Sequence, residues 1–253
     1  MSIISQYERS IKYIPKIIHQ IWVGDAEPHH AISTFQNNAE MEKHGWKHIL
    51  WTDENISEFE LIKSPVFREE RDQACRADIL RYEILYKYGG IFVDADSLLL
   101  NPNLDVFLDH DFFSCYENYG AGIGHGAINY DQNRIANGVI GCKKNNPILR
   151  DILDNIEDSY RENRVHGVVQ STGPDFFTRM VMGHKSKSTI FPCFTFYPIW
   201  WCTDLKRNPM GKLFEYVKGL DTDTIKSIFP RSYMFQYGDS SYQYNANGVH
   251  PSQ

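Results

Sequence analysis

The sequence predicts an α/β fold in which a mixed, mostly parallel sheet is flanked by helices. Short apolar runs typical of buried strands recur along the chain, at residues 17–23, 46–51, 91–93, 98–100, 111–116 and 136–141. Segments with apolar residues at helical spacing lie between and after them, at residues 32–44, 76–88 and 147–163. Because strands that alternate with helices build parallel sheets covered on both faces, we expect this layered arrangement.

Residues 76–102 are the stretch around which the predicted fold is organised. Apolar residues repeat there at spacings of three and four, at Ala77, Leu80, Ile84 and Tyr88. The pair Gly89 and Gly90 then supplies the left-handed residue on which helices commonly end. Residues 91–93 are too short and too apolar for a half-exposed strand, so we expect a central strand. Asp94-Ala95-Asp96 follows at once, where the carboxyl end of a strand opens onto a crevice.

The two aspartates of this D-x-D triplet have the spacing needed to face one cation. Residues two apart in an extended chain point to the same side, and Mg²⁺ and Mn²⁺ prefer carboxylate oxygens completed by substrate phosphates. Asp78 and Arg81 are three apart on the preceding helix, so we expect them side by side next to its apolar stripe. The other D-x-D triplets, at 109–111 and 221–223, follow no apolar strand and are interpreted as solvated loop or helix-cap acids.

Residues 76–105, RADILRYEILYKYGGIFVDADSLLLNPNLD, resemble the sugar-binding D-x-D region of glycosyltransferase family 32 and, more distantly, the glucosyltransferase domains of large clostridial toxins. The resemblance includes IPKIIHQIWVG at 14–24 and LWTDEN at 50–55, and it weakens from about Asn137 onward. It implies a GT-A-type, Rossmann-like fold, a nucleoside-diphosphate sugar as donor, Mn²⁺ or Mg²⁺ as cofactor, and retention of configuration at the transferred sugar.

The resemblance also implies roles for individual residues. Asp96 would bind the cation directly, and Asp94 would reach the ribose and the metal shell. Asp78 and Arg81 would hold sugar hydroxyls, the arginine also lying near phosphate charge. With Asp94 and Asp96, these two residues make up the predicted catalytic set. The implied donor contacts are Trp22, Val23, Asp78, Arg81, Asp94, Ala95 and Asn137.

The chain departs from the family pattern near its C-terminus. Family members tend to carry a His-His-x-x-x-Ser-Trp type segment that helps to hold the metal and diphosphate. The corresponding stretch here is 236–242, QYGDSSY, which has neither histidine nor tryptophan. A neutral amide and a phenol are poorer cation ligands than imidazole, so Asp239 or Ser240 would have to serve as the third metal ligand.

Several residues keep two interpretations at this level. Trp22 could stack on the donor's base or pack in the core, and Asn137 could bind a sugar hydroxyl or form an Asn-Gly turn. We expect His19 to be a hydrogen-bonded core histidine rather than a ligand. Residues 118–133, with four glycines, could form an acceptor loop or an ordinary surface excursion. A helix is expected to begin at Pro174.

Properties of the whole chain narrow the class of protein. Its 253 residues are interpreted as one domain, with a nucleotide-sugar-binding half at about 14–116 and an acceptor-side half at about 117–253. The net charge of −6 without a strongly basic run argues against nucleic acid as a partner. The five cysteines lack C-x-x-C spacing, which favours reduced thiols over a disulfide framework or a zinc site. No secretory signal or membrane-spanning run is present, so we expect a soluble cytoplasmic protein, with peripheral membrane association left open.

The sequence and the resemblance together predict a metal-dependent glycosyltransferase. It would move a hexosyl group from a UDP or GDP sugar to a hydroxyl of a glycan or glycoconjugate, as in polysaccharide biosynthesis. Two alternatives stay open. Residues 91–99, IFVDADSLL, superficially match the nucleophile strand of haloacid-dehalogenase-type phosphohydrolases. The altered C-terminal segment is also compatible with a sugar-nucleotide-binding protein that has lost turnover.

Overall fold

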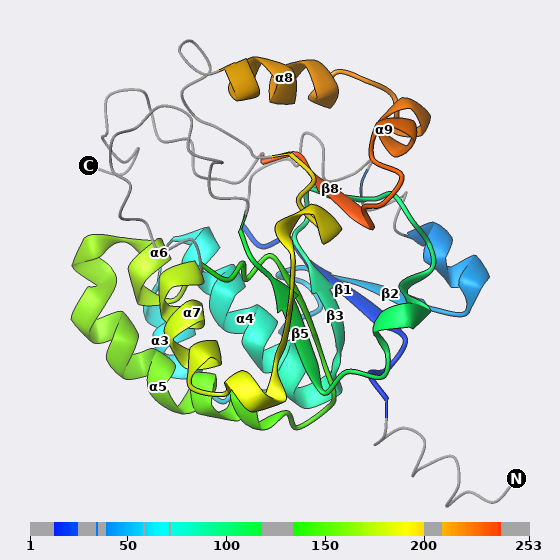
Figure 1. Cartoon of the computed structure of the whole chain (residues 1–253). Coiled ribbons are helices and arrows are strands. Elements are labelled where there is room, and N and C mark those ends of the chain that lie inside the picture. The colour runs from blue at the N-terminus through cyan, green and yellow to red at the C-terminus, as the bar shows by residue number, and fades with distance from the viewer. Residues whose placement is uncertain are drawn as a thin grey trace, which may run out of the picture.

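The fold is an α/β structure built on one mixed sheet (Figure 1). A computed structural model describes residues 13–24, 34, 39–57, 59–70, 72–117, 134–199 and 209–238. In this part of the chain the main sheet has the strand order β2 (Lys47–Trp51), β1 (Ile17–Ile21), β3 (Gly90–Val93), β6 (Val139–Cys142), β5 (Phe112–Cys115), β7 (Thr189–Phe191). The pairings make β6 antiparallel to both of its neighbours and the other strands parallel to one another. This confirms the predicted α/β class.

Helices cover one face of this sheet, which lies toward the left of Figure 1. They are α3 (Ser64–Glu69), α4 (Gln73–Tyr88), α5 (Pro147–Asn163), α6 (Val168–Ser171) and α7 (Pro174–Met182). Short 3₁₀ helices occur at η1 (Glu40–His44), η2 (Leu104–Phe107), η3 (Arg164–His166), η4 (Lys185–Lys187) and η5 (Cys193–Thr195). The predicted starts of α5 at Pro147 and of α7 at Pro174 are confirmed, because proline is tolerated at the first helical position.

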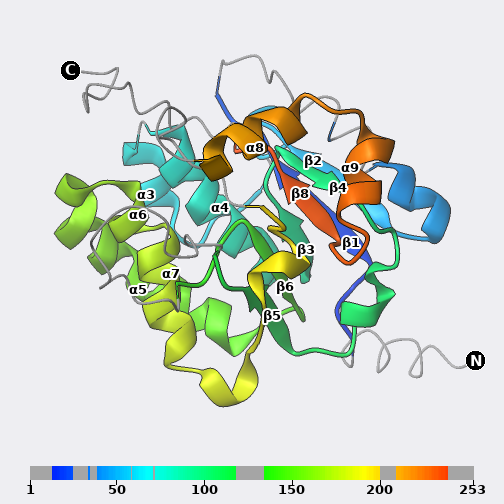
Figure 2. The ribbon, with the colours of Figure 1, turned by 45° about the horizontal axis from the view of Figure 1, so that its top comes forward.

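A second, two-stranded ribbon lies beyond the end of the main sheet (Figures 1 and 2). It pairs β4 (Ser97–Leu99) with β8 (Met234–Gln236) in antiparallel fashion. Helices α8 (Pro209–Lys218) and α9 (Thr222–Ile228) share an apolar cluster with this ribbon. The ribbon therefore connects the stretch after the D-x-D triplet to residues near the C-terminal end of the described chain.

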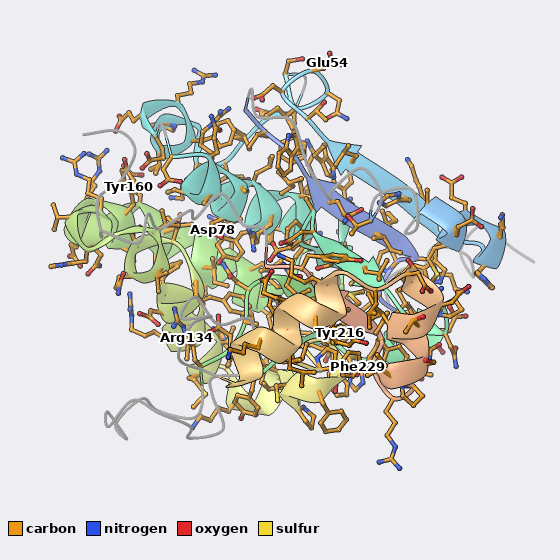
Figure 3. All side chains as sticks on the ribbon, turned by 90° about the horizontal axis from the view of Figure 1, so that it is seen from above. Glu54, Asp78, Arg134, Tyr160, Tyr216 and Phe229 are labelled. Carbon is orange, nitrogen blue, oxygen red and sulfur yellow. The ribbon has the colours of Figure 1, made fainter. Side chains whose placement is uncertain are left out.

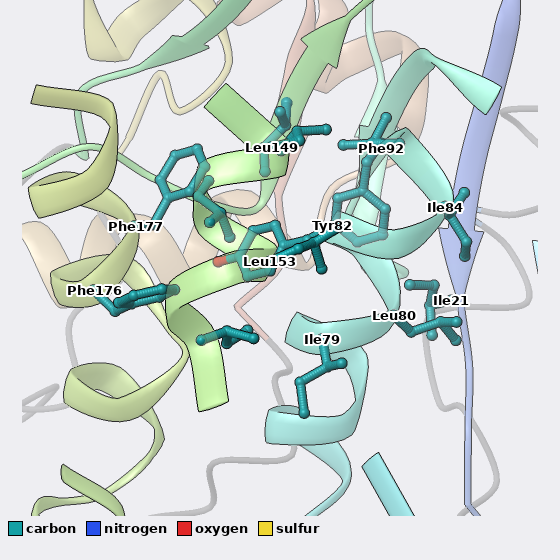
Figure 4. Close-up of a cluster of buried hydrophobic side chains, with 14 of the residues drawn as sticks. Ile21, Ile79, Leu80, Tyr82, Ile84, Phe92, Leu149, Leu153, Phe176 and Phe177 are labelled. Atoms are coloured by element: carbon teal, nitrogen blue, oxygen red, sulfur yellow. The ribbon is translucent and has the colours of Figure 1, made fainter. Parts of the chain in front are cut away.

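The side-chain alternation of the strands divides the core between the two faces of the sheet. Phe92 points into the cluster under α4, α5 and α7, whereas its neighbours Ile91 and Val93 belong to the cluster on the opposite face. Phe112 and Phe113 on β5 are divided in the same way. Figure 4 shows Phe92 beside Tyr82 in the first of these clusters, to which Leu149, Leu153 and Phe177 also belong. Burying one such aromatic side chain stabilises the fold by about 1.5–3 kcal/mol. Because each face of the sheet carries such a cluster, packing on both faces stabilises the sheet.

Helix α4 is more deeply buried than its sequence pattern predicted. The pattern indicated one apolar face with the charged residues beside it, but Asp78, Arg81 and Glu83 are buried together with the apolar positions. The difference arises because α4 packs against α3, α5, β1 and β3, which leaves little of its circumference for solvent. Gly89 ends the helix as expected, with a positive φ of 66°, but its ψ of −166° is extended rather than that of the left-handed helical conformation.

His19 is the hydrogen-bonded core histidine that the sequence predicted. Its Nδ1 accepts from Trp51 Nε1 at 3.1 Å, so its Nε2 carries the proton and donates to the Gly89 carbonyl at 2.9 Å. Burial lowers the pKa of His19 to about 4, so the ring is neutral at physiological pH. This histidine therefore fastens the end of α4 to β1 and β2.

Four further expectations have different outcomes. The expected helix over 32–44 is described only at residues 34 and 39–44, where its last part is the 3₁₀ helix η1. The glycine-rich stretch 118–133 lies outside the described residues. The acids at 109–111 and 221–223 lie away from the sheet edge described below, and Asp221 caps α9 by accepting from the Thr224 N–H at 2.9 Å. The four cysteines in the described part of the chain, Cys75, Cys115, Cys142 and Cys193, are free thiols as expected.

Candidate functional site

The predicted site residues gather at one edge of the main sheet. Strands β1 and β3 run parallel, so Trp22 and Asp94 emerge at the same edge. Because β6 runs antiparallel, its first residues meet this edge from the other direction, and Val139 is paired with Val93. Asn137 and Gly138 therefore lie beside Asp94, whose N–H donates to the Gly138 carbonyl at 2.9 Å.

Arg81 links two carboxylates at this edge. Its Nη2 lies 3.2 Å from Asp78 Oδ1, and its Nη1 lies 3.2 Å from Asp94 Oδ1. The guanidinium also donates to the Asn137 carbonyl at 2.7 Å and stacks over the Phe92 ring, 4.5 Å from the ring centroid. The planar fork of arginine suits such a set of fixed acceptors, so Arg81 holds α4, β3 and β6 in one arrangement.

Asp78 is sealed inside this cluster. It is 4% exposed, and both carboxylate oxygens accept hydrogen bonds, Oδ1 from Asn137 Nδ2 at 2.8 Å and Oδ2 from Thr172 Oγ1 at 2.9 Å. Burial raises the pKa of Asp78 to about 6, and the Arg81 charge and the two hydrogen bonds only partly oppose this. Asp78 is thus a positioning group for Arg81 and Asn137, with its oxygens turned away from solvent.

Asn137 is held by contacts that fix the orientation of its amide. Its Nδ2 donates to Asp78 Oδ1 and, at 3.1 Å, to the Tyr82 hydroxyl, which in turn donates to the Thr172 carbonyl at 2.9 Å. The orientation of the Asn137 amide is therefore set by Asp78 and Tyr82. The alternative interpretation, in which Asn137 forms an Asn-Gly turn, is partly confirmed, because residues 137–138 form a bend directly before β6.

Asp94 is the most accessible acid of the cluster. Its side chain is 31% exposed although Arg81 pairs with it. Gly138 gives this carboxylate its room, because a Cβ at that position would lie 2.3 Å from Asp94 Oδ2 and 2.6 Å from the Tyr197 hydroxyl. The glycine that follows Asn137 is therefore required by a close approach at the site.

The backbone between the two aspartates is also fixed. Gln20 on β1 donates from Nε2 to the Asp94 carbonyl at 3.1 Å, and Thr34 Oγ1 donates to the Ala95 carbonyl. Gln20 itself accepts from His48 Nε2 at 2.8 Å. This buried chain of hydrogen bonds presents the D-x-D triplet in a defined conformation, which the sequence pattern did not reveal.

Asp96 faces the β4–β8 ribbon. Its side chain is mostly buried, and Gln236 Nε2 donates to its Oδ1, while Gln236 Oε1 accepts from Ser97 Oγ. The Tyr237 N–H donates to the Asp96 carbonyl at 3.1 Å. The C-terminal segment identified from sequence thus reaches the D-x-D triplet, but through an amide that donates a hydrogen bond.

The acids fit a hard divalent cation by ligand type, although they form an incomplete shell. Asp94 and Asp96 supply carboxylate oxygens, the ligand type that Mg²⁺ and Mn²⁺ prefer. The extended chain expected for this triplet is wrong, because residues 95–96 form a turn in which the Ser97 N–H donates to the Asp94 carbonyl at 3.0 Å. No group of three or more His, Cys, Asp or Glu side chains that could hold a metal ion occurs within the described residues. The expected third ligands Asp239 and Ser240 lie outside those residues.

The remaining predicted donor contacts flank this cluster. Trp22 and Val23 follow β1, with Trp22 half-buried and Val23 buried, and the Trp22 N–H donates to the Trp51 carbonyl at 2.8 Å. Ala95 lies between the two aspartates and is half-buried. Sequence reasoning missed Tyr82, Thr172 and the hydrogen-bonding role of Gln236, whose contacts join residues far apart in the chain.

Comparisons with known proteins identify similar sequences. A family model described as capsular polysaccharide synthesis protein matches residues 2–167. Inositol phosphoceramide mannosyltransferase 3 of Schizosaccharomyces pombe is 32% identical over 154 residues, which are 59% of this chain and 39% of that protein. The uncharacterized glycosyltransferase L373 of Acanthamoeba polyphaga mimivirus is 32% identical over 173 residues, 65% of this chain and 63% of that protein. The chain therefore spans less than two thirds of the length of these curated relatives.

Solved structures support the fold. The PaToxG glycosyltransferase superposes with a TM-score of 0.51 at 19% identity, covering 72% of this chain and 76% of that one. This likeness confirms the expected GT-A-type fold. Within the described residues, no helix has both the length and the apolar character that crossing a membrane requires.

Proposed function

This chain belongs to the capsular polysaccharide synthesis protein family, and we propose that it is a glycosyltransferase that uses a nucleoside-diphosphate sugar. It would move a hexosyl group to a hydroxyl of a glycan or glycoconjugate, with retention of configuration. The observation that carries the proposal is the ion-paired cluster of Asp78, Arg81 and Asp94 at the carboxyl edge of the sheet, where Asp94 begins the D-x-D triplet. Open α/β sheets bind ligands at such an edge.

The donor would lie across β1, β3 and the start of β6. Arg81, which pairs with Asp94, and Asn137, whose amide is held by Asp78 and Tyr82, would recognise sugar hydroxyls. Trp22, which follows β1 at this edge, offers a flat aromatic face for the base. Asp78 acts through its partners, because its own oxygens are already engaged by Asn137 and Thr172.

Asp94 and Asp96 would hold a divalent cation, with the donor's diphosphate completing the ligands. When bound, Mn²⁺ or Mg²⁺ supplies Lewis-acid stabilisation of the diphosphate. Gln236 would keep Asp96 oriented through its amide hydrogen bond. Among the described residues we identify no carboxylate as an enzymic nucleophile. None is needed if the acceptor attacks the same face of the sugar from which the diphosphate leaves.

A donor panel tests this proposal. The full chain is incubated with UDP-glucose, UDP-galactose, UDP-N-acetylglucosamine or GDP-mannose in Mn²⁺, and release of nucleoside diphosphate is measured. We expect release from one class of donor, and loss of that release in Asp96→Ala. Absence of both donor binding by calorimetry and nucleotide release would refute the proposal. Binding without release would favour the lapsed-enzyme alternative, and hydrolysis of an aryl phosphate would favour the phosphohydrolase.

A further inference from the structure

A second set of charged groups lies across β6 from the donor-side cluster. Glu117 comes two residues after β5, and β5 runs parallel to β3 with β6 between them. Asp94 and Glu117 therefore emerge at the same edge on the two sides of β6. Since neighbouring strands lie about 4.8 Å apart, the two backbones are separated by about 10 Å, which leaves room for a sugar ring with an incoming hydroxyl beside it.

The charge of Asp94 acts on Glu117 across β6. Burial raises the pKa of Glu117 to about 7; the Arg134 charge opposes this, while Asp175 and Asp94 reinforce it. Burial also raises the pKa of Tyr197, and the charges of Asp94 and Glu117 both contribute. The Tyr197 hydroxyl lies over Gly138, next to Asp94.

The position of Glu117 is fixed by backbone and side chain. Its N–H donates to the Arg134 carbonyl at 2.8 Å, and Tyr116 forms a bridge with Ile135. Glu117 Oε2 lies 3.3 Å from Arg134 Nε, which lies 3.1 Å from Asp175 Oδ1 at the start of α7. Figure 3, which shows the molecule from above, labels Arg134, the partner of Glu117, and Asp78 of the donor-side cluster. One cation is thus shared by two carboxylates, and the group carries a net negative charge.

Glu117 differs from the acids of the donor side in how its carboxylate oxygens are engaged. Asp78 has both oxygens engaged, Asp94 is paired with Arg81, and Asp96 receives the amide of Gln236. The Glu117 side chain keeps 26% of its surface exposed and shares Arg134 with Asp175. An incoming hydroxyl needs a hydrogen-bond acceptor that can also take up its proton, which a half-buried carboxylate provides.

We propose that Glu117 is a catalytic residue that binds the incoming acceptor hydroxyl and accepts its proton, with Arg134 and Asp175 as positioning residues. The inference rests on the proposed glycosyl transfer. The acceptor oxygen forms a bond to the anomeric carbon while the bond from that carbon to the diphosphate breaks and the nucleoside diphosphate leaves with the electron pair. The hydroxyl proton passes to Glu117 and then to solvent, so atoms and charge balance.

Glu117→Gln tests this with water and glycerol as the acceptors. The variant keeps size and hydrogen bonding but cannot take a proton at that atom. We expect the kcat for hydrolysis of the active nucleotide sugar, and for transfer to glycerol, to fall by about 10²-fold. The calorimetric Kd for that donor with Mn²⁺ should stay within about twofold, because Glu117 lies outside the donor-side cluster. Glu117→Asp should recover part of the rate.

Glu157→Gln is the matched control, because Glu157 pairs with Arg161 on α5 and its side chain is, like that of Glu117, partly exposed. It should leave kcat and Kd unchanged. Wild-type kcat in Glu117→Gln would overturn the inference, as would a Kd that weakens in step with kcat, which would make Glu117 a donor-binding group. If the wild-type chain neither binds nor turns over any nucleotide sugar, the proposed function falls and the inference with it.

Discussion

Replacing Asp78 by asparagine should stabilise the fold near neutral pH while impairing donor binding. The folded-state pKa is raised from 3.8 to about 6, so the native chain holds this proton more tightly than the unfolded chain. Its stabilising effect is complete below pH 3.8 and is lost as pH rises through 6. The difference, 6 − 3.8 = 2.2 pKa units, corresponds to a destabilisation of about 3 kcal/mol when Asp78 is ionised.

The charge balance of the cluster agrees with that sign. Asp78 and Asp94 share the single guanidinium of Arg81, so the asparagine variant leaves one cation with one carboxylate. Part of the gain is offset, because an asparagine Nδ2 beside Thr172 carries two N–H donors where the ionised carboxylate carries none, and one donor left unsatisfied costs about 1 kcal/mol. A net stabilisation of about 2 kcal/mol at pH 7.5 is therefore expected, shrinking toward pH 5.

Urea unfolding of both chains at pH 7.5 and pH 5 measures this, and calorimetry with the active donor and Mn²⁺ measures binding. Asp154→Asn is the control, because Asp154 lies on the exposed side of α5 paired with Arg150; it should change stability by less than about 0.5 kcal/mol at both pH values. The reasoning would be refuted if Asp78→Asn had a lower unfolding free energy than wild type by the same amount at pH 7.5 and pH 5, since the ionised carboxylate would then stabilise the fold.

Three further outcomes are expected. Gly138→Ala places a Cβ 2.3 Å from Asp94 Oδ2, so donor affinity should fall and the unfolding free energy drop by about 1–3 kcal/mol, as read by calorimetry and urea unfolding. His19 has its pKa lowered from 6.5 to about 4, so its stabilising effect is present above pH 6.5 and lost as pH falls through 4; His19→Leu should be less stable than wild type at pH 7.5, with a gap that closes toward pH 4. Gln236→Ala removes the amide from Asp96, and Mn²⁺ affinity in the presence of UDP or GDP should weaken by about tenfold in an electron paramagnetic resonance titration.

The sequence predicted those parts of the fold that depend on local patterns. The helical spacing of α4, its stop at Gly89 and the short apolar strand β3 are all encoded within residues 76–93, and the structure follows them. The full length of α5, from Pro147 to Asn163, was predicted for the same reason. Local spacing also placed Asp78 and Arg81 side by side, and their contact is 3.2 Å.

Contacts between distant residues could not be predicted in this way. Thr172 reaches Asp78 across 94 residues of sequence, and Gln236 reaches Asp96 across 140. The burial of Asp78 likewise depends on packing of several elements around α4, which a helical pattern does not encode. The antiparallel direction of β6, which brings Asn137 to the site, is a property of topology rather than of its own residues.

The most direct measurement of the central claim is a crystal structure of the full chain with Mn²⁺ and the nucleoside diphosphate of the active donor, with data collected for the anomalous signal of manganese. The account predicts an anomalous peak within coordination distance of an Asp96 carboxylate oxygen, with the diphosphate on the same ion and Arg81 facing the sugar side. A nucleotide bound elsewhere, with no manganese at Asp94 or Asp96, would contradict it.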